Sequence, residues 1–466
     1  MHRLARVLVL FLMLALPALA PPAAAQAEDG AAVKRGQYLA LAGDCIACHT
    51  AVGGKPMAGG LVMPSPIGNI VSTNITPSRI HGIGNYSLEQ FSAAVRKGVR
   101  ADGAQLYPAM PYPSYALVSD EDMADLYAFF MRGVDPVDTA PAGKTELPFP
   151  FNVRMSMAAW NLLFLGERTY RADTSKSAEW NRGAYLARGL AHCGACHTPR
   201  NMFMAEDQSR ELGGAFVGPW LAPNITSDER SGVGGWSVHE LVDYMRFGHA
   251  SGKGQASGPM LEAVDNSLRY LSEPDLLAMA VYLKELPAVR SNTAVRPAYS
   301  WGAASPGLQE VRGTQLPREP DKASGEQLYD AHCATCHQAR GEGTPDGGMP
   351  PLFHNTTVGH IDTSNLVLVI LDGIRHTGSK PEVTMPGFAD MLSDTQVATL
   401  GAYLIKHFGN PAAVVTEAQV RQLRARGEPS GLVTLARVAI VLAVLVLAGL
   451  VYLLVRRLGF APGDAP

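Results

Sequence analysis

The feature that most constrains this chain is a five-residue pattern, Cys-x-x-Cys-His, that occurs three times. This pattern attaches a c-type haem, because its two thiols form thioethers to the porphyrin edge and the histidine after them ligates the iron. All six cysteines of the chain belong to the three patterns, so none is left for a disulfide. We therefore predict three covalently bound haems c, held by Cys45, Cys48 and His49, by Cys193, Cys196 and His197, and by Cys333, Cys336 and His337.

Two other kinds of site contain a Cys-x-x-Cys pair. A structural zinc site needs a second pair of ligands, whereas these three pairs lie far apart in the sequence. A thioredoxin-like redox pair does not require a histidine directly after the second cysteine. Because the histidine is present all three times, the sequence favours haem over both alternatives.

The composition and the N-terminus indicate an exported protein of about three domains. A length of 466 residues gives room for that many domains of ordinary size. The net charge of −3 gives no sign of the basic surface that binds nucleic acid. Residues 1–25 are predicted to be a signal peptide, with Arg3 and Arg6 ahead of the apolar run Val7–Leu16 and small residues at Ala23–Ala25. Haem attachment and export together indicate the bacterial periplasm.

Two segments of the chain, 30–134 and 180–286, are related by an internal duplication. The triplet Asn74-Ile75-Thr76 recurs 150 residues later as Asn224-Ile225-Thr226, in each case after a haem pattern. Each segment is predicted to begin with a helix ahead of its haem pattern and to end with a serine-capped helix. That arrangement is typical of small cytochrome c domains with one haem.

The rest of the chain divides by composition into five parts. Residues 135–179 are too apolar for a flexible linker and are predicted to form a packing strap across the first two domains; a partner-docking or quinone-facing surface is the alternative. Residues 287–322 are predicted to form an extended surface linker, and residues 323–410 a third, smaller cytochrome c domain. Residues 411–431 are polar and are predicted to form a short tether to a transmembrane helix at 432–455.

The predicted fold is therefore mainly α-helical, with three tandem cytochrome c-like haem domains and a single C-terminal transmembrane helix. Arg456 and Arg457 follow the apolar span and favour a cytoplasmic C-terminus. The haem domains would then lie on the periplasmic side of the bacterial cytoplasmic membrane.

The second axial ligand of each iron decides between electron transfer and chemistry at the metal. The predicted ligands are Met110, Met260 and Met385, which lie 61, 63 and 48 residues after their proximal histidines. Each methionine stands beside a proline and ahead of the closing helix of its domain. The alternatives are Met57, Met63, Met349 and Met391, or a second histidine among His81, His239, His249, His354, His360 and His376. None of these histidines recurs at an equivalent position of the repeat.

Taken together, the three haem patterns, the two Asn-Ile-Thr segments and the segments 147–151, 258–260 and 384–387 resemble one known family. This is the three-haem cytochrome c subunit of bacterial membrane-bound dehydrogenases, which oxidise alcohols, aldehydes, gluconate, fructose or sorbitol. The resemblance covers about residues 30 to 410. It implies a separate catalytic subunit that carries flavin, pyrroloquinoline quinone or molybdenum. This chain would pass electrons through its haems to ubiquinone or a terminal oxidase.

On this interpretation the chain has no substrate chemistry of its own, and no residue is assigned a catalytic role. The first alternative is a cytochrome peroxidase-type haem enzyme, which would need an iron with an open or displaceable sixth position. The second is a haem subunit of a terminal oxidase. Three candidate methionines for three haems favour electron transfer.

Overall fold

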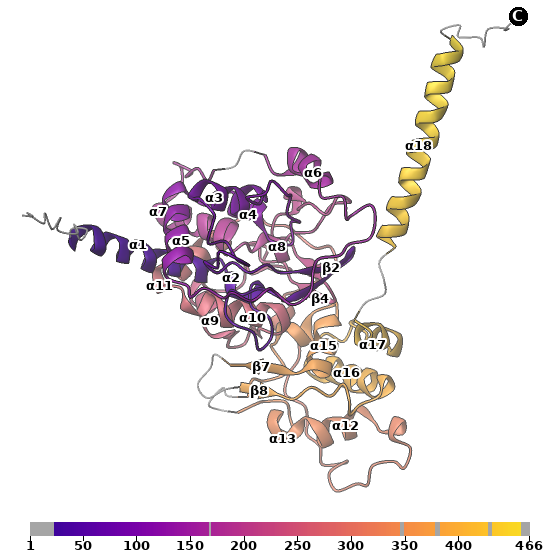
Figure 1. Ribbon diagram of the computed structural model, residues 1–466. Coiled ribbons are helices and arrows are strands. Elements are labelled where there is room, and N and C mark those ends of the chain that lie inside the picture. The colour runs from indigo at the N-terminus through magenta and orange to yellow at the C-terminus, as the bar shows by residue number, and fades with distance from the viewer. Residues whose placement is uncertain (1–22, 167–168, 345–348, 378–382, 427–430, 458–466) are drawn as a thin grey trace, which may run out of the picture.

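The computed structural model describes residues 23–166, 169–344, 349–377, 383–426 and 431–457 (Figure 1). The predicted signal peptide, residues 1–25, lies almost entirely outside these residues. The chain is mainly helical, as predicted, and the described residues contain four separate two-stranded antiparallel sheets. The body consists of packed helices and loops, and one long helix, α18, projects from it (Figure 1).

The first unit is built around two helices that cross, α1 and α5. Arg35 of α1 forms two hydrogen bonds to the buried carboxylate of Asp125, at 2.6 and 3.0 Å. The neighbouring Gly36 lies so close to α5 that a Cβ on it would be 1.9 Å from the carbonyl oxygen of Asp125. Only glycine therefore fits at this crossing. The helices of this unit are α1 (Ala23–Ala42), α2 (Cys45–Cys48), α3 (Leu88–Lys97), α4 (Tyr112–Tyr115) and α5 (Asp120–Arg132).

The second unit repeats this crossing with α7 and α11. Arg182 binds Asp275 at 2.7 and 2.9 Å, and a Cβ on Gly183 would lie 1.9 Å from the carbonyl oxygen of Ala278. The duplication predicted from the Asn-Ile-Thr triplets therefore extends to the helix crossing itself. The helices are α7 (Ala178–Tyr185), which continues as a π-helical turn (Leu186–Leu190), α8 (Gly194–His197), α9 (Val238–Phe247), α10 (Gly258–Asn266) and α11 (Glu273–Lys284).

The strands form short hairpins beside the helices. Two of the hairpins stand at equivalent places in the first two units, ahead of the Asn-Ile-Thr segments, and pair Val62 with Val71 and Ala215 with Ala222. The strands are β1 (Val62–Ser65), β2 (Gly68–Val71), β3 (Ala215–Val217), β4 (Trp220–Ala222), β5 (His249–Ala250), β6 (Gly254–Gln255), β7 (Ile374–His376) and β8 (Val383–Met385). Single 3₁₀ turns lie at Gln208–Arg210, Leu268–Tyr270, Ala298–Ser300 and Pro320–Lys322.

The first two units share one hydrophobic core, a feature that the sequence did not predict. Buried side chains from Leu39 to Leu286 form a single contiguous cluster. Polar contacts at this interface are reciprocal. The hydroxyl of Tyr38 donates to Asp275 (2.5 Å) and accepts from the amide of Ser272. In the same way, the hydroxyl of Tyr185 donates to Asp122 and accepts from the amide of Ser119. Each unit thus binds the N-terminus of the other unit's closing helix.

The third unit has its own core and is fastened to the second by polar contacts. The side-chain amide of Asn365 forms two hydrogen bonds with the backbone of Leu221, at 2.8 and 2.9 Å. His376 of β7 lies 2.8 Å from Asp265 of α10, and both side chains are largely buried. The helices of this unit are α12 (Gly325–His332), α13 (Ala334–His337), α14 (Thr356–Gly359), α15 (Ser364–Asp372) and α16 (Asp394–Phe408).

The predicted tether, residues 411–431, contains a packed helix in its described part. Its helix α17 (Glu417–Arg424) buries Val420 and Leu423 in the core of the third unit. Arg424 binds the carboxylate of Asp394 at 2.8 Å and the carbonyl of Leu392. The sequence did not predict this helix, because a polar composition concealed two apolar positions three residues apart on one helix face.

After α17 comes α18 (Leu432–Arg457), which has no buried residue. Of the described helices, it alone is long and apolar enough to cross a membrane, with a mean hydropathy of 3.1. Its bounds include the predicted span 432–455.

The strap, residues 135–179, contacts both of the first two units. Thr145 accepts a hydrogen bond from the amide of Val71 in β2 (2.9 Å). The strap contains helix α6 (Ser156–Phe164), in which the indole of Trp160 donates to the carbonyl of Phe203 in the second unit (2.9 Å). The sequence did not predict this helix within the apolar segment.

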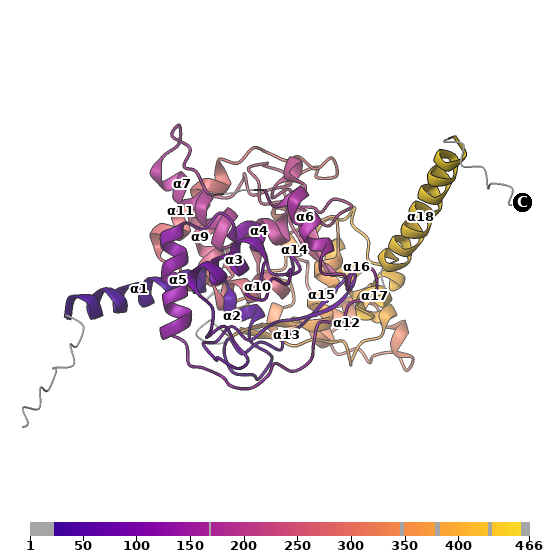
Figure 2. The same ribbon diagram turned by 45° about the horizontal axis from the view of Figure 1, so that its top comes forward.

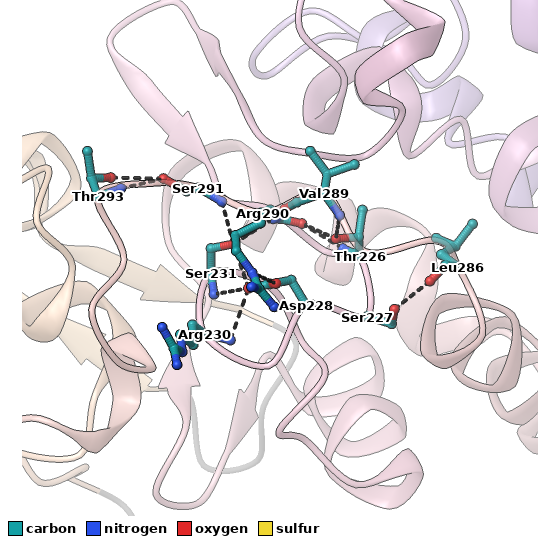
Figure 3. A network of polar contacts seen from close by, with 11 residues as sticks. Thr226, Ser227, Asp228, Arg230, Ser231, Leu286, Val289, Arg290, Ser291 and Thr293 are labelled. Carbon is teal, nitrogen blue, oxygen red and sulfur yellow. Dashed lines mark hydrogen bonds and ion pairs between the residues drawn. The ribbon is translucent and has the colours of Figure 1, made fainter.

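The predicted linker, residues 287–322, lacks long regular elements, as expected, but it is fixed at both ends. Figure 3 shows its first residues bound to the loop of the second unit that contains Thr226 and Asp228. Further along, Leu308 is almost fully buried in the core of the third unit. The third unit therefore begins earlier and ends later than the predicted boundaries, 323–410.

The carboxylate of Asp228 is the centre of the network in Figure 3. It is 2% exposed and accepts hydrogen bonds from the amides of Arg230 (3.0 Å) and Ser231 (2.8 Å) and from the guanidinium of Arg290 (3.2 Å). Burial alone would raise the pKa of Asp228, but the hydrogen bonds from Ser231 and Arg290 outweigh burial and hold the pKa below its ordinary value.

We expect Asp228→Asn to lower the unfolding free energy at neutral pH by about 1–3 kcal/mol, because the amide keeps one acceptor oxygen but loses the negative charge and the oxygen that accepts from Arg290. A carboxyl pKa that is lowered in the folded state stabilises the protein at pH values above the ordinary carboxyl pKa. This stabilisation is lost as the pH falls through the lowered pKa. The difference in Tm between wild type and variant should therefore narrow in acid. Asp102→Asn, at the exposed pair with Arg100, is the control and should change Tm little. A Tm difference that is the same at all pH values would contradict this role.

Candidate haem sites

The histidine of each Cys-x-x-Cys-His pattern is held in one orientation by a backbone carbonyl. The Nδ1 atoms lie 2.7 Å from the oxygen of Thr73 for His49, 2.7 Å from that of Pro223 for His197 and 3.3 Å from that of Pro350 for His337. A carbonyl can only accept, so Nδ1 carries the proton and Nε2 keeps its lone pair for a metal. Burial lowers the pKa of all three imidazoles, which favours the neutral form that binds metals.

The Asn-Ile-Thr segments hold two of these carbonyls in place. Asn74 directly follows Thr73, and its side-chain oxygen accepts from the amide (2.9 Å) and hydroxyl (2.7 Å) of Thr76, while its amide donates to the carbonyl of Val137. Asn224 forms the same contacts in the second unit, with Thr226 and Val289. The sequence indicated a structural loop here. Its part in orienting the proximal histidine follows only from the structure.

The cysteines of each pattern stand in, or directly before, one short helical turn, α2, α8 or α13, so that both thiols can face one edge of a ring. Burial raises the pKa of Cys45 and Cys193 to about 12, unlike the activated thiolate of a redox pair. In the part of the chain that the structure describes, no group of three or more His, Cys, Asp or Glu side chains is placed to hold a metal ion. The short spacing of the two cysteines suits covalent attachment of a porphyrin.

The third unit brings three of its four predicted site residues together around one cavity, whereas Cys336 is exposed. This cavity is lined mostly by apolar side chains, and its lining includes Cys333, His337 and Met385. Pro350, whose carbonyl faces His337, also lines it, together with Phe388. A cysteine, a histidine and a methionine around an apolar space fit a haem c with His/Met ligation.

The other two predicted methionines pack against the shared core of the first two units. Met110 precedes α4 and Met260 lies in the first turn of α10, and both are half-buried against the cluster that also contacts Cys45 and Cys193. Both methionines are therefore placed in the same apolar interior as the haem patterns of their units.

The alternative ligands occupy other environments. Met57 is buried in the first unit, whereas Met391 is 64% exposed. The ring of His376 pairs with Asp265, and that of His360 contacts the backbone of Asp362. The structure thus gives two of the histidine candidates local polar partners.

One carboxyl group at the junction of the first two sites was not predicted from the sequence. Asp44 directly precedes Cys45, and burial, followed by the charge of Glu262, raises the pKa of Asp44 to about 8. Asp44, Glu262 and Cys196 also act electrostatically on Cys48. The first two haem patterns therefore lie next to each other. No local signal reveals this proximity, because it depends on how the two units pack.

Comparison with known families supports haem binding at both ends of the body. Residues 33–133 match the family model described as "Cytochrome c", and residues 320–404 match that of "Cytochrome C oxidase, cbb3-type, subunit III". The chain therefore contains cytochrome c domains, whose prosthetic group is haem c. The second match covers a single haem domain and does not extend to the rest of the chain.

Several curated proteins match along most of their length. The chain is 45% identical to the fructose dehydrogenase cytochrome subunit of Gluconobacter japonicus, over 91% of both chains. It is 40% identical to the cytochrome c subunit of the quinone-dependent alcohol dehydrogenase of Gluconobacter oxydans, over 87% of this chain and 84% of the relative. It is also 40% identical to the gluconate 2-dehydrogenase cytochrome c subunit of Pantoea cypripedii, over 86% and 90%.

These matches confirm the resemblance drawn from the haem patterns and loops, and they do not favour the peroxidase or oxidase alternatives. Each of the three relatives is a cytochrome subunit of a dehydrogenase, and each is matched over at least 84% of both chains. The chain belongs to the family of cytochrome c subunits of membrane-bound dehydrogenase complexes, and its function is electron transfer.

Proposed function

We propose that this chain carries three haems c and passes electrons from a catalytic dehydrogenase subunit to ubiquinone or a terminal oxidase. The observation that carries the proposal is the repeated geometry of the three patterns, in which each histidine turns Nδ1 to a carbonyl and leaves Nε2 for iron. When bound, each haem supplies an iron that alternates between the ferrous and ferric states.

The protein's own residues fix the haems and set their properties. The six cysteines hold the porphyrins covalently, and His49, His197 and His337 are the proximal ligands. Met110, Met260 and Met385 are the proposed distal ligands, which fill the sixth position and raise the reduction potential. The cavity shared by Cys333, His337 and Met385 supports this assignment for the third haem.

The catalytic partner is inferred from the relatives, which serve fructose, alcohol and gluconate dehydrogenases. All three substrates carry hydroxyl groups. We infer a partner that oxidises a hydroxyl of an alcohol, sugar or sugar acid with a flavin, pyrroloquinoline quinone or molybdenum cofactor. The shared core of the first two units and the polar interface to the third hold the haems in a fixed arrangement for transfer.

We also propose a topology in the bacterial cytoplasmic membrane. Residues 1–25 direct export, α18 spans the bilayer once, and Arg456 and Arg457 remain in the cytoplasm. The haem units then lie on the periplasmic side. The uncharged stretch of α18 and its lack of buried residues support this arrangement.

The number of haems and the substrate can be tested together. We expect the purified complex to contain three haems per copy of this chain, measured as alkaline pyridine haemochrome against protein. Fructose, ethanol and gluconate are added separately to oxidised membranes. The haems should become reduced with the substrate of the true catalytic partner. A ratio of two haems, or haems that no dehydrogenase substrate reduces, would contradict the proposal.

For Met385→Ala we expect covalent haem to remain while the reduction potential of one haem falls. Cys333, Cys336 and His337 still hold the porphyrin, but loss of the thioether removes the ligand that favours ferrous iron. A spectroscopic redox titration should show one of three components shifted downward. Met391→Ala, at an exposed methionine, is the matched control. An unchanged titration of Met385→Ala would mean that Met385 serves packing alone.

Removal of residues 427–466 should give a protein that still matures with its haems but is no longer integral to the membrane. The third unit should stay folded, because α17 already closes its core with Val420 and Leu423. The measurement is the fraction of haem-stained chain released by alkaline carbonate, with the full chain as control. A truncated chain that stays in the carbonate pellet would contradict the role of α18 as the integral anchor.

A further inference from the structure

Helix α6 turns apolar side chains outward and a polar side chain inward. Leu162 and Leu163 are 85% and 71% exposed, and Met155, just before the helix, is 73% exposed. Asn161 points into the body, where it accepts from the hydroxyl of Tyr112 (2.7 Å) and donates to the carbonyl of Lys97 (3.1 Å). The helix has no charged residue. This distribution is the reverse of that in a helix on the surface of a soluble protein.

A loop of the second unit extends the apolar surface. Met202 is 86% exposed, and the ring of Phe203 lies 5.7 Å from that of Phe164 in α6. The indole of Trp160 also donates to the carbonyl of Phe203, so the helix and the loop are fixed side by side. We call this surface the α6 patch, which consists of Met155, Leu162, Leu163, Met202, Phe203 and Met204. Six large exposed apolar side chains on adjoining segments indicate an interface.

The part of the strap that precedes α6 is hydrogen-bonded to the first turns of α18. The guanidinium of Arg437 donates to the carbonyl of Phe149 at 3.0 Å. From Val438 to Val455 there is no charge, and this stretch spans about 27 Å as a helix, close to the thickness of the hydrocarbon core. Arg437 therefore lies at the boundary of the bilayer, and Phe149, bonded to it and half-exposed, lies at the same level.

The arrangement of the elements agrees with this position. In Figure 1, α6 lies on the upper side of the body, the side toward which α18 extends, while α12 and α13 lie at the opposite end. In Figure 2 the top has come forward, and α6 lies between α4 and the side of the body from which α18 rises.

We propose that the α6 patch inserts into the interface of the same bilayer that α18 crosses and forms a second, monotopic membrane contact. This inference rests on the proposed spanning role of α18. An uncharged helix with exposed leucines, adjoined by Phe203 and preceded in the strap by Phe149, which is hydrogen-bonded to Arg437, suits the region between headgroups and acyl chains. Two points of contact then prevent the haem units from rotating about α18.

The test is site-specific photo-crosslinking of the full chain in its native membranes. p-Benzoylphenylalanine at position 163 should give a phospholipid adduct, identified by mass spectrometry of the labelled peptide. Position 447, within α18, is the positive control. Position 316 is the negative control, because Leu316 is exposed but shortly precedes α12, at the end of the molecule away from α18.

A crosslink from position 163 to another polypeptide would overturn the proposal and make the α6 patch a protein-docking surface. No adduct at 163, with lipid captured at 447, would also overturn it and leave the spanning role of α18 intact. No lipid at 447 would instead refute the spanning role, and this inference with it.

A second variant separates contact from folding. With the photo-crosslinker at position 203, Leu162→Glu combined with Leu163→Glu should abolish the lipid adduct while the haem content stays unchanged. A lipid adduct that persists in this variant would show that the leucines of α6 do not hold the patch in the bilayer, contrary to the proposal.

Discussion

The structure depends on a hydrogen bond from each proximal histidine to a backbone carbonyl. His49 and Thr73 show what this requires: the carbonyl must be fixed in a loop that is remote in sequence, and Asn74 fixes it through Thr76 and Val137. The haem patterns alone would attach a porphyrin to a flexible segment. The hairpins and Asn-Ile-Thr loops turn that attachment into a site of defined orientation.

The way the units associate follows from the duplication. Because Tyr38 and Tyr185 occupy equivalent positions, each can reach the N-terminus of the other unit's closing helix, as in an isologous contact between two copies of one chain. The third unit lacks such a tyrosine contact and is joined instead through Asn365 and the pair of His376 with Asp265. The first two units therefore form one body, and the third is attached to it through a different interface, which also includes the apolar side chains of Trp220 and Ile374.

The sequence was informative where the chemistry is local. Covalent haem attachment, serine caps such as Ser119 and the positions of Met110 and Met260 within the repeat depend on short segments or on their repetition. The shared core and the fixed ends of the linker were not predictable in this way, because they depend on which apolar faces meet. Helix α17 was not predicted for the same reason. Its burial depends on the hydrogen bond of Arg424 to Asp394, which precedes it by thirty residues.

The packing of α17 also limits how far the third unit can move from α18, the proposed membrane anchor. Arg426 is bonded to Asp372 of that unit, and Gly431 already precedes α18, so five peptide links separate the folded body from its anchor. Even a fully extended chain covers only about 18 Å over that distance. In the proposed topology the third unit therefore stays within this distance of the membrane and cannot move to a distant electron acceptor. Any acceptor has to come to it, by lateral diffusion in the plane of the membrane or along its surface.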